Sequence, residues 1–373
     1  MTPSRLLWAV LAAATLLVGC SLGPQALKGN RADYNAVISS SNNDEMLLNL
    51  VRIRHYDAPF FLNVASVSSS FNYDVSAGFD LKVNAGPIEG YKGQYPYNAA
   101  TPSVGAKFSE NPSIIYVPLS GEKFATQLLT EISLDRLLFL SRAGWNIDLL
   151  FHLLVKRFGH SVNKSIAMDS TLNLDPARTA AFDALADTLR RMQNRGDLEL
   201  NAGPESGQMR SVILQLRFAG SDEAEALGRL LGLRLATTAL GGGRSLARIA
   251  LTQTNDLRTE NACTADTCQV FVQLRNFIGI LDALAQGVVV PKDSAVADQA
   301  GPPRATPVPF TVESGLTVPA AAFVAASYDG HWYFIPKSDV ASRKVFSFLI
   351  QLFALEGGEL PKNTPLLTLP VNR

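Results

Sequence analysis

Three cysteines and four histidines are the residues of this chain best suited to covalent or metal chemistry. The histidines are His55, His152, His160 and His331. No two of them have the close spacing of a zinc motif. Gly159-His160-Ser161 has the wrong order for a nucleophile elbow, which places serine between two glycines. The sequence therefore predicts no metal site and no cofactor.

Two further segments contain residues that are common in catalytic or ligand-binding sites. Gly241-Gly242-Gly243 lacks the spacing and the following lysine of a phosphate-binding loop, so we expect a flexible turn between a helix and a strand. His331 stands beside an aromatic pair, which favours a position next to a turn over a catalytic role. His152 lies on an apolar segment and is expected in the core or at its edge.

The N-terminus has the layout of a secretory signal. Arg5 is its only charge, and an apolar run from Leu6 to Val18 follows. That run is too short for an ordinary transmembrane helix, which needs about 20 residues. A small residue, Gly19, then precedes Cys20.

The segment Leu17-Val18-Gly19-Cys20 resembles the lipobox of bacterial lipoproteins. The resemblance implies that residues 1–19 are a signal peptide and that Cys20 carries acyl chains such as palmitate. Two or more chains give stable attachment to a lipid bilayer, because each buried methylene contributes about 0.8 kcal/mol. Ser21, in place of an aspartate, implies an outer-membrane lipoprotein facing the periplasm.

Cys263 and Cys268 are separated by four residues. An even pair in an exported protein favours a local structural disulfide. Free thiols are the alternative. A zinc site would need more ligands, and a redox site would be expected to have Cys-x-x-Cys spacing.

Residues 84–103 are rich in Gly, Pro and Asn and lie between two strand-like segments. The segment contains Tyr91, Tyr95 and Tyr97. Tyrosine supplies contact area at low entropic cost, so these residues are candidates for a partner-binding loop. The alternative is a flap that packs on the sheet below.

Composition narrows the class of protein. The chain has 373 residues, of which 47% are hydrophobic, and 33 basic residues balance 33 acidic ones. Such a composition is typical of folded globular proteins. A neutral chain without basic clusters gives no argument for nucleic-acid binding.

Hydrophobic periodicity predicts an α+β fold, with mixed, largely antiparallel sheets, packed amphipathic helices and one or two subdomains. Asp175-Pro176 predicts a helix start, and Gly196 its end. Asp329-Gly330 between apolar runs predicts a hairpin with a type I′ turn. Arg31–His55 is predicted to be mainly helical, whereas 145–158 fits either a helix or a strand.

The same patterns suggest an order of segments along the chain. A lipidated tether at 20–30 follows the signal peptide. An α+β subdomain is expected at 31–165, and an α/β-patterned subdomain at 166–291. A flexible linker at 292–309 leads to a C-terminal hairpin, helix and strand at 310–373, which pack back on the core.

Two classes of function fit these observations. The first is a non-catalytic lipoprotein of the cell envelope that assembles with, supports or binds protein partners. The second is an envelope hydrolase whose site is formed by residues far apart in the sequence, because such sites often leave no local motif.

Overall fold

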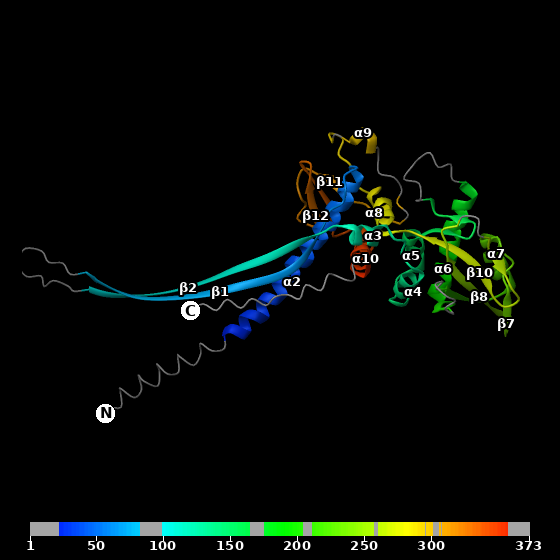
Figure 1. The fold of residues 1–373 in the computed structure, drawn as a ribbon, viewed down its shortest axis with the longest axis horizontal. Coiled ribbons are helices and arrows are strands. Elements are labelled where there is room, and N and C mark those ends of the chain that lie inside the picture. Colours follow the sequence, from blue (N-terminus) through cyan, green and yellow to red (C-terminus); the bar gives the residue numbers. More distant parts are fainter. Residues whose placement is uncertain are drawn as a thin grey trace, which may run out of the picture. The chain divides into compact units, whose positions relative to one another are not determined.

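The computed structural model describes residues 22–82, 99–164, 175–203, 211–256, 260–294, 296–300, 306 and 308–356. Contacts divide the chain into a larger unit, Met1–Phe61 with Ser120–Leu360, and a smaller unit, Leu62–Leu119 with Pro361–Arg373. Figure 1 shows the elements of both units.

The smaller unit contains a ribbon of two long strands, β1 (Phe61–Lys82) and β2 (Ala99–Leu119), which pair with each other. The strand-like segments that the sequence predicts on either side of residues 84–103 are confirmed. Three consecutive side chains near the end of β2, Ile115, Tyr116 and Val117, are exposed. The ribbon has no third strand among the residues that the structure describes.

An eight-stranded sheet forms the centre of one part of the larger unit. Its main path runs β4-β3-β10-β8-β6-β5, while β7 also pairs with β8 and β9 with β10. Strands β8 and β10 pair in parallel, and the other described pairs of this sheet are antiparallel. The strands are β3 (Val155–Phe158), β4 (Ser161–Val162), β5 (Leu198–Ala202), β6 (Ser211–Phe218), β7 (Thr237–Gly241), β8 (Arg244–Gln253), β9 (Ala262–Cys263) and β10 (Cys268–Leu274).

Strand β6 shows why this sheet has one buried face. Val212, Leu214 and Leu216 are buried, whereas the residues between them are only partly covered. Leu214 pairs with Ile249 of β8, which is also buried, so the apolar residues of neighbouring strands share a face. Burying each such side chain contributes about 1.5–3 kcal/mol.

Helix α6 (Pro176–Arg195) packs beside this sheet and begins and ends as the sequence predicts. The side chain of Asp175 accepts a hydrogen bond from the backbone N–H of Ala177. Gly196 ends the helix with a φ of 74°, a left-handed conformation that glycine adopts without strain.

Further helices of the larger unit are short and amphipathic. They are α3 (Glu122–Leu129), α4 (Leu134–Arg142), α5 (Ile147–Leu154) and α7 (Ser221–Leu231). The segment 145–158, which fitted helix or strand, is both: α5 ends at Leu154 and β3 starts at Val155.

The remaining elements gather around a three-stranded sheet with the order β11-β13-β12. They are α2 (Leu22–Arg54), α8 (Phe277–Ala285), α9 (Ala297–Ala300), β11 (Glu313–Gly315), β12 (Ala322–Tyr328), β13 (His331–Pro336) and α10 (Val340–Glu356). The predicted hairpin is confirmed, since Asp329 and Gly330 have φ values of 47° and 77°, both positive as a type I′ turn requires. Helix α2 packs against α8 and β12.

Three local predictions differ from the structure. The stretch 20–30, predicted as a tether, is helical from Leu22, and Pro24 is compatible with this helix because it lies in the first turn, where a missing N–H costs nothing. The glycine run connects strands β7 and β8 rather than a helix and a strand. Residues 99–103, predicted as part of the loop 84–103, belong to strand β2.

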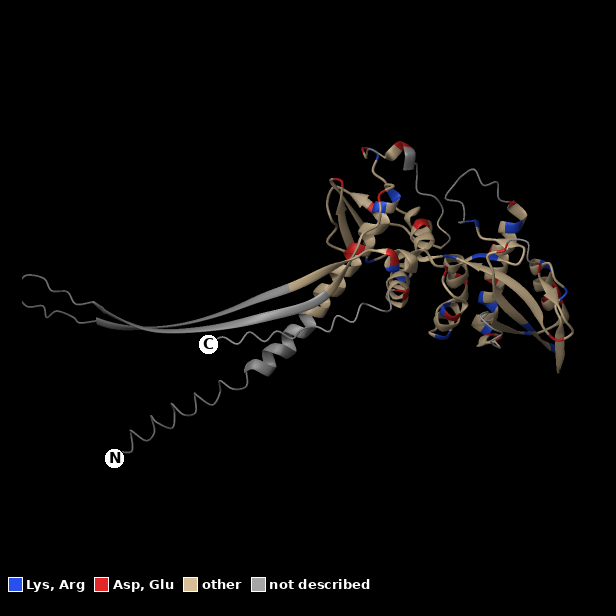
Figure 2. Ribbon diagram, in the orientation of Figure 1, with Lys and Arg blue, Asp and Glu red and all other residues tan. Residues whose placement is uncertain are grey.

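The fold is therefore α+β, with mixed and largely antiparallel sheets, as the sequence predicts. Figure 2 shows lysines and arginines interspersed with acidic residues over the larger unit. The final strand expected near Leu366 lies outside the described residues.

Candidate functional site

A cleft of about 750 Å³ lies between α7 and the β7–β8 hairpin in the larger unit. Binding pockets typically have volumes of about 300–1,000 Å³. The cleft is lined by Ser221, Ala224, Glu225, Gly228, Arg229, Gly232, Leu233, Arg234, Leu235, Thr237, Ala239, Gly241, Gly243, Arg244 and Ser245. It is large enough to hold several side chains of a ligand.

Arginine dominates the charge of the cleft. Arg229 and Arg234 are exposed, and within the described residues neither has a carboxylate at ion-pair distance. Arg244 is paired with Asp197, with 3.0 Å between Nη2 and Oδ1. Glu225 is the only acidic residue of the described lining. The cleft thus carries an excess of positive charge.

The disulfide predicted between Cys263 and Cys268 is present, with an S–S distance of 2.08 Å. Both cysteines face each other as Cα partners of β9 and β10. The turn between them is closed by a 2.9 Å hydrogen bond from the N–H of Thr264 to the carbonyl oxygen of Thr267. Sequence reasoning found this pair because its spacing is local.

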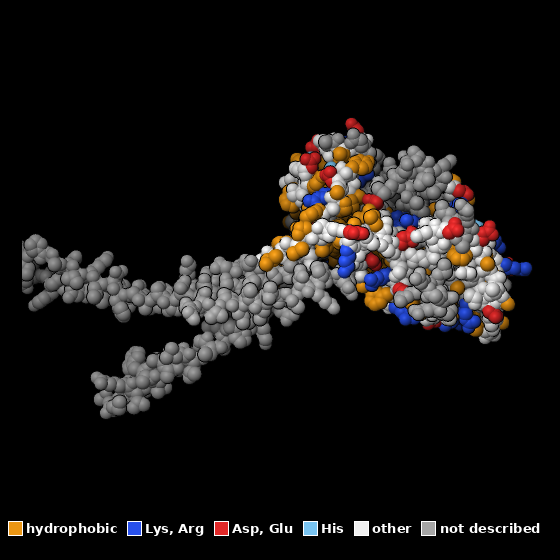
Figure 3. Space-filling model, in the orientation of Figure 1, with side chains coloured by type: hydrophobic (Ala, Val, Ile, Leu, Met, Phe, Trp, Pro, Cys, Tyr) orange, Lys and Arg blue, Asp and Glu red, His pale blue; other side chains and the backbone are white. Residues whose placement is uncertain are grey.

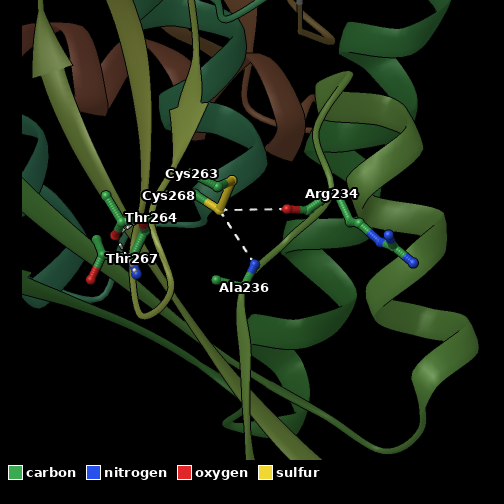
Figure 4. Close-up of a disulfide and its surroundings, with 6 residues drawn as sticks. All are labelled: Arg234, Ala236, Cys263, Thr264, Thr267 and Cys268. Carbon is green, nitrogen blue, oxygen red and sulfur yellow. Dashed lines mark hydrogen bonds between the residues drawn. A yellow bond between two sulfur atoms is a disulfide. The ribbon is translucent and has the colours of Figure 1, made fainter.

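The disulfide also contacts the segment that lines the cleft (Figure 4). The backbone N–H of Ala236 donates to Sγ of Cys268 over 3.4 Å, and this sulfur lies 4.0 Å from the carbonyl oxygen of Arg234. The Arg234 side chain points away from the disulfide. The bridge therefore holds the backbone of residues 234–236 beside the start of β10 and leaves the guanidinium free to face a ligand.

Strand β7 forms the rim of the cleft. All five of its residues are exposed, and none is charged. It pairs with β8 in antiparallel fashion, and no other described strand pairs with it. An uncharged edge strand with open backbone groups is a template for pairing with another chain.

Two of the four histidines belong to a polar cluster at the end of α2. Nε2 of His55 lies 2.8 Å from the hydroxyl of Tyr333, which is fully buried. Burial lowers the pKa of His55 and raises that of Tyr333 to about 12, so both groups are held neutral near pH 7. Nε2 of His331 lies 3.2 Å from Oδ2 of Asp293.

The contact of His55 with Tyr333 joins the end of α2 to the C-terminal hairpin. Tyr328 of β12 completes the cluster by donating a hydrogen bond to Asp57. No described pocket opens onto the cluster. Its geometry is that of a packing contact between α2 and β12–β13 rather than of a site.

His152 is largely buried on α5, and its ring packs edge-on against Phe182 with 5.7 Å between ring centroids. Burial lowers its pKa. Its Nδ1 atom lies 3.9 Å from Asp183. His160 is exposed and lies next to Gly232, where an added Cβ atom would be 3.0 Å from the histidine ring.

The lipidation site Cys20 and the loop residues Tyr91, Tyr95 and Tyr97 lie outside the described residues. Within the described part of the chain, no helix is long and apolar enough to cross a membrane. The same residues contain no group of three or more His, Cys, Asp or Glu side chains that could hold a metal ion.

The hydrolase hypothesis requires a nucleophile and a base that share a pocket. The described lining of the cleft includes the hydroxyls of Ser221 and Ser245 but no histidine, although His160 lies next to Gly232 of that lining. The cleft itself was missed by sequence reasoning. Its one local signal was the glycine run 241–243, where all three φ values are positive and the chain reverses between β7 and β8.

Comparisons with known protein families, with curated proteins and with solved structures find no match to this chain. Its function is therefore inferred from its own sequence and structure.

Proposed function

We propose that the chain is a lipid-anchored component of the bacterial cell envelope that binds or assembles with protein partners rather than catalysing a reaction. The anchor is the acylated thiol of Cys20, as the resemblance to the lipobox implies. The observation that carries the assembly role is the ribbon of β1 and β2.

A two-stranded ribbon is marginally stable in water, and three or more strands or a packed face are normally needed. Strand β1 has 22 residues, which corresponds to about 70 Å of extended backbone. Within the described residues, neither strand has a second neighbour. A strand supplied by another protein would pair these open edges, which supports a role in assembly.

The two edges are chemically different. Strand β2 contains Pro102, Pro112 and Pro118, which are separated by even numbers of residues. Backbone N–H groups alternate between the two edges of a strand, so the three missing donors fall on one edge. A proline on the edge that faces β1 would interrupt the hydrogen bonds between the two strands, so we infer that the three prolines lie on the outer edge of β2 and prevent pairing there. Strand β1 has no proline, so its outer edge is the one that a partner strand would pair with.

Site-specific photo-cross-linking in native membranes tests this role. A photoreactive residue in place of Ser68, near the middle of β1, should give a discrete cross-linked species. The matched control replaces Phe139, an exposed residue of α4 in the larger unit, and should give only background. The mass of the species identifies a second copy or another envelope protein. Equal background at both positions would contradict the assembly role.

The anchor is tested separately by acyl labelling. Cys20→Ser should abolish labelling and leave an unprocessed or mislocalised precursor. Labelling equal to that of the unmodified protein would contradict the lipoprotein assignment, whatever the cross-linking shows.

A further inference from the structure

The geometry points to a peptide-binding site at the cleft between α7 and β7. An extended segment with an acidic side chain adds as a strand to the outer edge of β7, and its carboxylate pairs with Arg229 and Arg234. This inference concerns the larger unit alone. It stands or falls independently of the lipid anchor and of the β1–β2 ribbon.

The edge of β7 supplies the backbone part of the site. Thr237–Gly241 spans about 17 Å, which is enough to pair with four or five ligand residues. Natural proteins usually protect such an edge with charge, proline or a covering element. Here the strand carries neither Lys nor Pro, and Leu240 is 51% exposed. Its backbone is therefore available to a ligand strand.

The cleft supplies the side-chain part. Successive ligand side chains point to opposite faces, so every second one would enter the space between β7 and α7. Thr237, Ala239 and Gly241 line that space with small groups, which leaves room for larger ligand side chains. Figure 3 shows charges of both signs over one face of the larger unit, so a local excess of arginine is needed to select a ligand.

Charge selects an acidic ligand. The cleft holds Arg229, Arg234 and Arg244 against Glu225, and Arg244 is already paired with Asp197. Two guanidinium groups remain that have no carboxylate partner among the described residues. A guanidinium presents a planar pair of N–H donors that matches the two oxygens of a carboxylate.

The walls of the cleft are fixed before a ligand binds. The Cys263–Cys268 bridge holds residues 234–236 in place. Gly232 ends α7 at a φ of 66°, and the N–H of Leu233 donates to the carbonyl oxygen of Gly228 over 2.9 Å. A Cβ atom on Gly228 would lie 2.6 Å from the oxygen of Leu233, so this turn needs glycine. A fixed site loses less conformational entropy when it binds a ligand.

Two fluorescent seven-residue peptides test the proposal. Both alternate Thr and Val, and they differ only in a central Glu or Lys. Fluorescence anisotropy with the full chain in detergent should show the Glu peptide binding about tenfold more tightly than the Lys peptide. Backbone N-methylation on the pairing edge of the Glu peptide should abolish binding, because it removes the donors of the ladder.

Substitutions of the two arginines test how much their charges contribute to peptide binding. Arg229→Glu and Arg234→Glu should each weaken the Glu peptide about tenfold and reduce or reverse the preference over the Lys peptide. Arg248→Glu is the matched control, because Arg248 is exposed on β8 but does not line the cleft. It should change binding by less than about twofold. Circular dichroism checks that all three variants remain folded.

Hydrogen exchange locates the ligand. Those amides of residues 237–241 that point away from β8 should exchange rapidly in the free protein and slowly with the Glu peptide bound. Protection of these outer-edge amides without peptide would mean that the chain's own tail or a second copy already covers β7, and it would overturn the proposal. Equal affinity for both peptides, or no binding of either, would also overturn it.

Discussion

Replacing Asp282 with asparagine should stabilise the protein at neutral pH. Asp282 lies on α8, partly buried, and burial of the charged form raises the pKa of its carboxyl from 3.8 to about 6. Within the described residues, no hydrogen bond or ion pair of its carboxylate offsets this cost. The folded state therefore binds the proton more tightly than the unfolded state does.

The sign of the pH dependence follows from this difference. Between about pH 3.8 and pH 6 the folded state holds more protons than the unfolded state, so the free energy of unfolding decreases as the pH rises. The loss is complete above about pH 6 and absent below pH 3.8. The difference in pKa between the folded and unfolded states corresponds to about 3 kcal/mol in the free energy of unfolding. Solvent screening of the partly buried carboxylate reduces this to about 1–2 kcal/mol.

Asparagine has nearly the same shape as the protonated acid and stays neutral at every pH. Urea unfolding of the full chain in detergent, followed by circular dichroism, should find Asp282→Asn more stable than the unmodified protein by about 1–2 kcal/mol at pH 7.5. At pH 4 this advantage should largely disappear. Asp298→Asn, at an exposed position of α9, is the control and should show neither effect. The reasoning would be refuted if the difference in the free energy of unfolding between Asp282→Asn and the unmodified protein were the same at pH 7.5 as at pH 4.

Two further changes probe stability elsewhere in the larger unit. Replacing Cys263 and Cys268 together with serine should lower the free energy of unfolding by about 2 kcal/mol, because the bridge closes a short loop with a sequence separation of 5; unchanged urea midpoints would contradict this. Tyr333→Phe leaves buried His55 without its hydroxyl partner and should cost about 1–3 kcal/mol. Tyr333→Phe combined with His55→Leu should cost less than the sum of the single changes, and strict additivity would show that the contact contributes nothing.

Local signals in the sequence were enough for several elements. Asp175, Pro176 and Gly196 fix the ends of α6 because caps act within one helical turn. Asp329 and Gly330 fix the β12–β13 hairpin because only a few residues tolerate two positive φ values in succession. The Cys263–Cys268 bridge belongs to the same group, since both cysteines lie within one short hairpin.

Elements that depend on distant partners were not predictable in this way. The sequence of β7, Thr-Thr-Ala-Leu-Gly, has no buried face and therefore no alternation to reveal it. It forms a strand because β8 pairs with it across the glycine turn. The cleft depends in addition on α7 and on the contact of Ala236 with Cys268, 32 residues away. The spacing of residues along the sequence does not predict such long-range contacts.

The contact between His55 and Tyr333 joins residues 278 positions apart. Helix α2 therefore packs on a hairpin that is made near the other end of the chain. Contacts of such long range close slowly, since loop-closure entropy is lost before packing compensates for it. Synthesis begins at the N-terminus, so α2 is made long before β12 and β13 and cannot pack until they have formed. Until then the surface of α2 that packs on β12 stays uncovered, and truncation after β10 would leave α2 without that partner.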